Sequence, residues 1–431
     1  GKYDMETLDG KARRVLRLIF RTVMDRTRPY RSFVSPYHIA AARKIGAESI
    51  DLLKNDGGVL PLKDEGKILV VGEYAIKMMT VGGGSSSLKV KKEYSPLEGI
   101  RERFANAEVV FERGYVGDTG GQFDGVVTGQ DLNENRSAGQ MVADAVEAAR
   151  DADCVIFIGG LNKSNFQDSE GADRQSYELP YGQDAVIEAL AAVARKMVVI
   201  NISGNAVAMP WVDKVPAIVQ GWYLGSEAGH SLADVLSGDV NPSGKLPFTI
   251  GKQLSDYPVR TEAQYPGIAR AEAIKMGPME ATIFDAEYSE GLYVGYRWFD
   301  HESIVPTFAF GHGLSYTSFE IGEPKVSGSV EKGLTFSIPV KNTGDVAGAE
   351  VVQLYVTARN SSVERVPKEL KGFSKVYLEP GKTATVKITI GKDAVSYFDA
   401  GKHEWVAERG DYSALIGTSS DVLPKTVDFK Y

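Results

Sequence analysis

The stretch Cys154-Val155-Ile156-Phe157-Ile158 decides the fold, because it is one of five short apolar runs of strand length. Helical patterns around 137–150, 181–195 and 227–237 separate several of these runs. Such alternation between residue 67 and about residue 250 predicts a mostly parallel sheet with helices on both faces. Ligands of such sheets bind outside the carboxyl ends of the strands, so the loops after the strands are the place to look for chemistry. The other four runs are 68–71, 109–111, 198–202 and 217–220.

The last part of the chain has a different pattern. From about residue 315, apolar and polar residues alternate over 334–340, 352–356 and 386–390. Turn signals at 342–345 and 379–381 separate these runs. Short alternating strands at this spacing predict a β-sandwich of immunoglobulin or fibronectin type. Cys154 is the only cysteine, so no pair can form a disulfide, and the fibronectin-like version is preferred.

Two helices are expected before the sheet. Residues 8–24 place apolar side chains at helical spacing between arginines, and the next 12 residues give that stripe no obvious partner. The stripe is therefore expected to pack on something that this chain does not contain. A second helix is expected to run to the stop signal at 55–58. Its apolar face would carry Ile39, Ala42, Ile45, Ile50 and Leu53.

Composition excludes several classes of protein. The chain has 431 residues and a net charge of -8, which disfavours nucleic acid and anionic membranes as partners. No run of 18 apolar residues is present, so no membrane span is expected. The five histidines are scattered without metal-ligand spacing, so neither a metal nor a cofactor is expected. Cys154 is interpreted as a small buried hydrophobe.

The glycine-rich loop at 81–87 is the first candidate for chemistry. Gly82, Gly83 and Gly84 allow a backbone to approach a ligand closely. A nucleotide-binding α/β protein would want Gly-x-Gly-x-x-Gly or a lysine after the last glycine, and neither is present. A flexible or sugar-contacting loop is favoured, with Ser85 as the contact.

The loop at 162–174, which follows the run quoted first, is the second candidate. Asp168, Glu170, Asp173 and Arg174 lie within seven residues beside a glycine. Crowding by other carboxylates can raise the pKa of a carboxyl group, as a general acid at neutral pH requires. A solvated polar loop is the competing interpretation.

Longer motifs then bring in a family resemblance. Residues 50–62, IDLLKNDGGVLPL, resemble the entry to the second domain of family 3 glycoside hydrolases. Residues 169–174, SEGADR, followed by LPYGQ at 179–183, are similar to the family's "EG-x-DR…LP…Q" loop. Residues 238–247, GDVNPSGKLP, resemble its signature almost letter for letter. Further similar motifs are GYRWF at 295–299, FGHGLSYT at 310–317 and ELKGF at 369–373.

The resemblance implies a retaining glycosidase. Its nucleophile would be an Asp of an N-terminal (β/α)8 barrel, in a Ser-Asp-Trp-like motif, and its general acid/base a Glu of the second domain. Carried over by position, Glu170 is the acid/base. Asp168, Asp173, Arg174 and Ser85 are then assigned to substrate binding and loop shape.

The sequence departs from the family pattern in two places. Ser-Asp-Trp does not occur, and the helix at 8–24 resembles the last helix of the barrel. This chain alone is therefore expected to be inactive. Asp51 stands where an apolar residue is more usual, which would cost packing.

The resulting interpretation has four segments. Residues 1–38 are assigned to a barrel remnant and linker, 39–250 to the α/β sandwich, 251–311 to a connector and 312–431 to the fibronectin type III-like domain. The function expected is part of a β-glycosidase, first a β-glucosidase, acting on β-linked glucosyl or xylosyl residues. Expected partners are a β-linked oligosaccharide or glycoside and the barrel, with a homodimer also considered. The full enzyme is expected to be periplasmic or secreted. The alternative is a non-catalytic carbohydrate-binding or interaction module.

Overall fold

The computed structural model describes residues 4–27, 34–80, 83–117, 133–164, 166–170, 174–276 and 279–431. These residues belong to two compact units, 1–41 and 42–431. No helix among them is long and apolar enough to cross a membrane.

The first unit contains helix α1, Met5–Arg21, as the apolar stripe predicted. Asp4 caps the helix by accepting a hydrogen bond from the Thr7 amide at 2.6 Å. None of the helix residues is buried, and Val15 and Phe20 are 58% and 60% exposed. The described residues therefore leave the apolar stripe of α1 uncovered.

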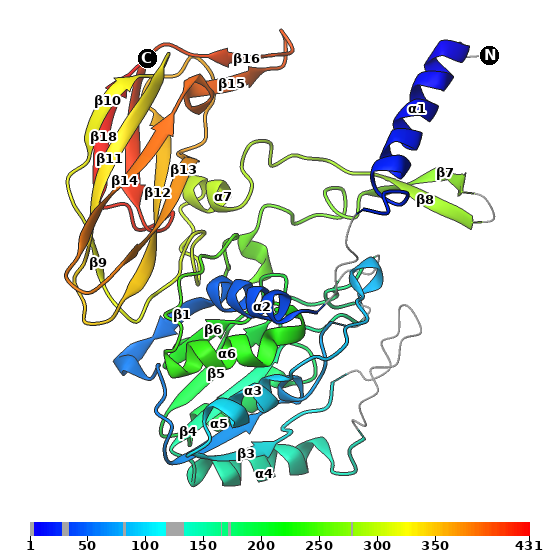
Figure 1. Cartoon of the computed structure of the whole chain (residues 1–431), viewed down its shortest axis with the longest axis vertical. Helices are drawn as coiled ribbons and strands as arrows, with labels where there is room; N and C mark the ends of the chain where they lie inside the picture. The colour runs from blue at the N-terminus through cyan, green and yellow to red at the C-terminus, as the bar shows by residue number, and fades with distance from the viewer. Residues whose placement is uncertain are drawn as a thin grey trace. The chain divides into compact units, whose positions relative to one another are not determined.

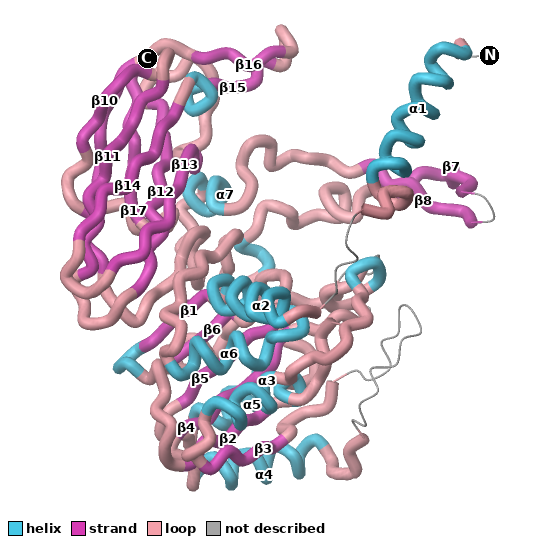
Figure 2. Tube along the Cα trace, viewed as in Figure 1, coloured by secondary structure: helices cyan, strands magenta, loops and turns pink. Residues whose placement is uncertain are grey.

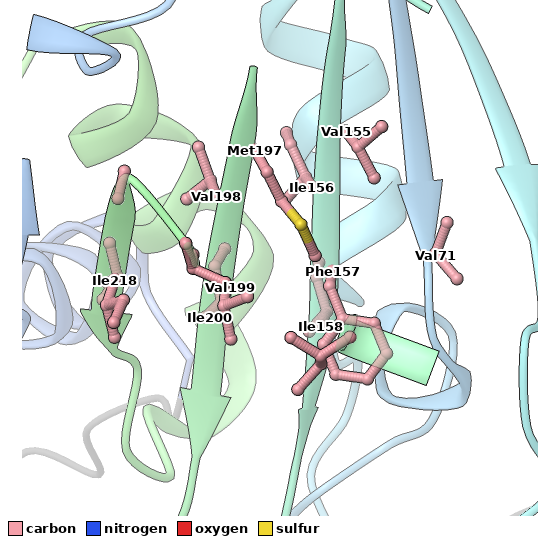
Figure 3. Close-up of a cluster of buried hydrophobic side chains, with 14 of the residues drawn as sticks. Val71, Val155, Ile156, Phe157, Ile158, Met197, Val198, Val199, Ile200 and Ile218 are labelled. Atoms are coloured by element: carbon pink, nitrogen blue, oxygen red, sulfur yellow. The ribbon is translucent and has the colours of Figure 1, made fainter. Parts of the chain in front are cut away.

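A six-stranded sheet forms the centre of the α/β part of the second unit, in the order β1-β6-β5-β4-β2-β3. The five predicted apolar runs are its parallel strands, which confirms the predicted α/β architecture. Residues 155–158 of β4 are fully buried, and they pack with Val199 and Ile200 of the neighbouring strand (Figure 3). Burying one such side chain stabilises the fold by about 1.5–3 kcal/mol. The parallel strands are β2 Lys67–Val71, β3 Glu108–Glu112, β4 Cys154–Gly160, β5 Met197–Ile202 and β6 Ala217–Gln220.

Helices cover both faces of this sheet. Helix α3 packs against α6, and α4 packs against α5. Right-handed crossovers place α3 on one face and α4 and α5 on the other, because the chain reverses direction across the sheet after β3. Figure 1 shows the helices around the strands. Their bounds are α3 Pro96–Arg103, α4 Ala138–Arg150, α5 Gln183–Ala191 and α6 Ala228–Ser237.

The second predicted helix is shorter than expected. Helix α2 is Pro36–Ser49, and the chain then forms strand β1, Asp51–Asn55, antiparallel to β6. The prediction that Ile50 and Leu53 belong to the helix is wrong. Leu52 and Leu53 are adjacent in sequence and both buried, as in a strand that is covered on both faces. A short apolar run does not distinguish helix from strand, and pairing with β6 decides this one.

The C-terminal part is the expected β-sandwich. Figure 2 shows the strands of this part packed together near the C-terminus. One sheet has the order β10-β11-β14 with β9 beside β11, and the other has the order β13-β12-β17-β18. The alternation predicted at 334–340 is confirmed, because Leu334, Phe336, Ile338 and Val340 are buried. The strands are β9 Phe319–Ile321, β10 Lys325–Ser329, β11 Gly333–Asn342, β12 Gly348–Ala358, β13 Glu369–Leu378, β14 Thr383–Ile390, β17 Asp411–Gly417 and β18 Lys425–Lys430, and a separate hairpin joins β15 Ser396–Asp399 to β16 Glu404–Ala407.

The connector between the α/β part and the β-sandwich contains more secondary structure than expected. It contains an antiparallel hairpin of β7, Ile268–Met276, and β8, Met279–Asp285, followed by helix α7, Tyr296–His301. The sequence of β7, IARAEAIKM, has few β-branched or aromatic residues, so strand propensity gave no signal there.

The motif at 238–247 joins the α/β layer to the sandwich. Lys245 Nζ donates to the carbonyl of Gly313 at 2.7 Å and forms an ion pair with Glu350 at 2.7 Å. Asn241 Nδ2 donates to the carbonyl of Ala347 at 2.9 Å. These polar contacts explain physically why lysine and asparagine stand in the motif.

Asp51 is a buried acid at the start of β1. Its side chain is 1% exposed, and Oδ2 has no hydrogen-bond partner among the described residues. Gly244 is packed so closely that a Cβ there would lie 2.0 Å from Asp51 Oδ1. Burial raises the pKa of Asp51 to about 8, although nearby Lys245 acts in the opposite direction.

We expect Asp51→Asn to stabilise the chain more at pH 9 than at pH 5. The folded pKa of Asp51 lies above its unfolded value near 3.8, so its stabilising contribution is lost as pH rises from about 4 to about 8. The asparagine of the variant carries no charge at any of these pH values. The free energy of unfolding of the variant, relative to the native chain, should therefore rise by about 2–5 kcal/mol between pH 5 and pH 9. Urea unfolding at pH 5, 7 and 9 measures this. The exposed Asp56→Asn is the control, and a pH-independent difference for Asp51→Asn would contradict the expectation.

Candidate functional site

The candidate site lies where the order of the parallel strands reverses. The chain passes from β2 to β3 on one side and then returns to β4 on the other side of β2. The loops after β2 and β4 therefore border a crevice at the carboxyl ends of the strands, where α/β sheets bind ligands. A hollow of about 590 Å³ lies there, and its lining includes Ser85, Asp168, Glu170 and Arg174. These are four of the five side chains predicted from sequence, and Asp173 lies outside the described residues.

Glu170 is exposed at this hollow and is held by the glycine-rich loop. Its Oε2 accepts the Ser85 amide at 2.8 Å and the Ser85 hydroxyl at 2.5 Å. Its own amide donates to the carbonyl of Gly83 at 3.3 Å. The hydroxyl of Ser85, followed by its amide, lowers the pKa of Glu170. Crowding by carboxylates was expected to raise this pKa, and that expectation is wrong for this chain, because hydrogen bonds to the ionised form dominate.

The backbone of the glycine-rich loop is shaped to present Ser85. Gly83 and Gly84 both have left-handed conformations, with φ of 79° and 80°. A Cβ on Gly83 would also lie 2.8 Å from Lys163 Cε, so a larger residue would be both strained and crowded. Lys163 Nζ donates to the carbonyls of Ser86 at 3.0 Å and Thr80 at 3.4 Å. The loop thus carries a fixed pair of donors at Ser85.

Asp168 ties its loop to two neighbouring loops. Oδ2 accepts the Gly204 amide at 2.6 Å and the Tyr223 hydroxyl at 2.9 Å. Oδ1 accepts Asn205 Nδ2 at 2.6 Å. Both carboxylate oxygens are therefore occupied by the protein itself, and the geometry gives Asp168 a loop-holding task.

Arg174 also reaches the loop after β5. Its Nη2 donates to the carbonyl of Ala206 at 2.7 Å, and its guanidinium lies 6.0 Å from the ring centre of Tyr177. Its Nη1 is buried without a hydrogen-bond partner in the described part of the chain. Arg174 thus joins its loop to the loop after β5 through a backbone carbonyl.

Three residues that support the site were not singled out from sequence. Tyr223 bonds to Asp168, Lys163 holds the glycine-rich loop, and Glu93 binds the Met79 and Thr80 amides at 2.6 and 3.2 Å. Lys163 lies in the quoted loop after β4, so position alone was a signal for it. Glu93 gave no signal, because its partners, the Met79 and Thr80 amides and the Thr80 hydroxyl, lie 13 or 14 residues away in the sequence.

The arrangement can exchange a proton with a neutral ligand. Glu170 brings one exposed carboxylate to a hollow otherwise lined by hydroxyl, amide and backbone groups, with Arg174 and Asp168 engaged in protein contacts. No cluster of three or more His, Cys, Asp or Glu residues suited to a metal ion occurs within the described ranges.

Comparisons with known proteins agree with this architecture. Residues 50–296 match the glycosyl hydrolase family 3 C-terminal domain, and residues 350–420 match a fibronectin type III-like domain. The chain is 45% identical over 444 residues to beta-glucosidase BoGH3A of Bacteroides ovatus, covering 100% of this chain and 57% of that protein. It is 37% identical over 430 residues to thermostable beta-glucosidase B of Acetivibrio thermocellus, covering 99% and 52%.

Solved structures give the same result. The Bifidobacterium adolescentis GH3 beta-glucosidase matches with a TM-score of 0.84 and 31% identity, covering 100% of this chain and 58% of that chain. The chain thus spans about half the length of the curated relatives it matches.

Asp168→Ala should loosen the loop that carries Glu170. The substitution leaves the Gly204 amide, the Asn205 amide group and the Tyr223 hydroxyl without their acceptor. We expect a loss of about 1–3 kcal/mol in the free energy of unfolding and faster proteolysis within 162–170. Tyr223→Phe removes one of the three bonds and should have a smaller effect. Native-like proteolysis and unfolding of Asp168→Ala would show that these bonds do not hold the loop.

Proposed function

Because this chain belongs to glycosyl hydrolase family 3, as the match over residues 50–296 shows, we propose that it is the part of a retaining β-glycosidase that carries the acid/base loop. The observation that supports this most strongly is the position of Glu170. Its carboxylate lies at the reversal point of the sheet, facing a hollow large enough for a sugar ring. The substrate proposed first is a terminal β-linked glucosyl residue, with a xylosyl residue as the second choice.

Retaining hydrolysis explains the need for one such carboxyl group. As an acid, Glu170 gives its proton to the glycosidic oxygen while a nucleophile attacks the anomeric carbon. As a base, it then takes a proton from the water that releases the sugar. The nucleophile must stand about 5–5.5 Å from it, and by resemblance it belongs to a barrel domain. This chain alone is therefore proposed to be inactive on glycosides.

The remaining assignments are part of the same proposal. Ser85 and Arg174 are proposed to contact sugar in addition to the protein contacts described above, and Asp168 to act mainly by holding the loop. Asp173 stays a prediction from the motif. The expectations of a homodimer, of no nucleic-acid or membrane partner and of a periplasmic or secreted enzyme also stay predictions.

One observation favours a second function. A carboxylate whose pKa is lowered by Ser85 is a good acceptor for sugar hydroxyls, and a non-catalytic sugar-binding module would use it in that way. The two functions can be told apart. Only if Glu170 is catalytic should the effect of its substitution on the hydrolysis rate depend on the leaving group of the substrate.

Glu170→Gln, tested in the enzyme that contains the barrel, should lower hydrolysis of cellobiose by about 10²–10⁴-fold. Glucose is a poor leaving group that needs the proton. Dinitrophenolate does not, so the first step on dinitrophenyl β-glucoside, measured as the initial burst, should change by less than about tenfold. Steady-state and burst kinetics on the two substrates make the comparison.

Glu178→Gln is the matched control, since Glu178 is an exposed glutamate on the same segment and does not line the hollow. It should behave as the native enzyme does on both substrates. Equal losses on both substrates for Glu170→Gln would assign Glu170 to sugar binding or loop structure.

A further inference from the structure

Glu170 and Ser85 are joined in an asymmetric way. Both donors of Ser85, its amide and its hydroxyl, bind the same oxygen of Glu170, Oε2. Within the described part of the chain, no hydrogen bond to Oε1 is present. The two oxygens of the Glu170 carboxylate therefore have different environments, because Oε2 accepts two hydrogen bonds and Oε1 accepts none from the described residues.

Hydrogen bonds within and around the glycine-rich loop hold Ser85 in place beside Glu170. Glu93, which is 9% exposed, binds the amides of Met79 and Thr80 at the base of the loop. The Leu88 amide closes the loop by donating to the Thr80 carbonyl at 2.8 Å. Gly83 accepts the amide of Glu170, so the two loops are joined by backbone as well as by side chain. The position of Ser85 relative to Glu170 is thus set by several independent contacts.

The charged groups around Glu170 do not replace Ser85. Asp168 is bound to Gly204, Asn205 and Tyr223, and Arg174 to the carbonyl of Ala206. Lys163, from the same loop as Glu170, is directed to the carbonyls of Thr80 and Ser86. Among the described residues, the hydroxyl and amide of Ser85 account for the lowered pKa of Glu170.

We infer that Ser85 is the positioning residue of Glu170, holding Oε2 so that Oε1 is the oxygen that carries and takes the proton. This inference rests on the proposed acid/base role of Glu170. The Oε1–H bond breaks as its proton passes to the glycosidic oxygen, whose bond to the anomeric carbon breaks. The nucleophile of the barrel bonds to that carbon in the same step. Water later forms a new bond to the carbon as the bond to the nucleophile breaks, and it returns one proton to Oε1. Ser85 remains on Oε2 through both steps.

The same contact sets the balance between the two steps. Donors on Oε2 favour the ionised carboxylate, which is the form needed when Glu170 acts as a base. They oppose the protonated form, which is needed first. Removing the Ser85 hydroxyl should therefore keep Glu170 protonated to a higher pH.

The test uses Ser85→Ala in two settings. In this chain, the pKa of Glu170, followed by carbon NMR of labelled glutamate, should move upward from the native value. In the enzyme with the barrel, kcat/KM is measured as a function of pH, and its fall on the alkaline side (the alkaline limb) should move to a pH higher by about half to one unit. Ser85→Thr, which keeps the hydroxyl, should return both toward native. Ser86→Ala is the matched control, because the Ser86 hydroxyl donates to the Gly83 carbonyl instead, and the limb should stay in place.

Two results would overturn the inference in different ways. If the pKa of Glu170 in the chain is the same in Ser85→Ala and native protein, Ser85 does not position the carboxylate. If that pKa moves and the alkaline limb does not, the limb belongs to another residue. The acid/base assignment of Glu170 would then fail, while the contact between Ser85 and Glu170 would stand.

Discussion

The reversal of strand order beside β2 is the constraint on which the site depends. The parallel strands β2, β4, β5 and β6 are buried on both faces, and the loops after the parallel strands leave the sheet at its carboxyl end. Because β2 and β4 are neighbours, the loops after them meet although Ser85 and Glu170 are 85 residues apart in sequence. The two loops consist largely of glycine, serine and charged residues, and such residues alone do not fix the position of a loop. The buried sheet positions the carboxylate, and hydrogen bonds between the loops orient it.

A second level of polar contacts holds the loops to the layers around them. Asp168 reaches loops after β5 and β6, and Lys245 and Asn241 connect the sheet layer to the sandwich. Asp51 lies near Lys245, and its burial opposes its charge. A buried carboxyl group without a full set of partners costs stability, whereas Asp168, with three donors, contributes order to the loop.

Sequence reasoning succeeded where a pattern extends over many residues. The five apolar runs predicted the parallel strands, and the alternation at 334–340 predicted the sandwich, because burial sets both patterns directly. It also placed Ser85, Asp168, Glu170 and Arg174 in one region, since loops that follow parallel strands share an edge. The helix assigned through Leu53 failed because a segment with only two apolar residues, Leu52 and Leu53, fits helix and strand equally. Hairpin β7–β8 was missed because β7 has few β-branched or aromatic residues.

The finest features of the site were beyond sequence. Three carboxylates in one loop suggested that crowding raises the pKa of one of them, but Asp168 is bound to neighbouring loops and Glu170 to Ser85. The direction of a pKa shift depends on which donors face the group, and those donors come from segments far apart in the chain. Glu93 and Tyr223 act through a few hydrogen bonds to residues distant in sequence, and such bonds give no periodic pattern in a sequence.

The central claim is that Glu170 supplies and removes the proton at the glycosidic oxygen. Added azide tests it most directly in Glu170→Ala of the barrel-containing enzyme, with dinitrophenyl β-glucoside as substrate. Azide attacks the glycosyl-enzyme without needing a base, so it should restore turnover and give the β-glycosyl azide as product. Turnover that stays low at every azide concentration, with no glycosyl azide formed, would contradict the account and direct the search for the acid/base to another residue.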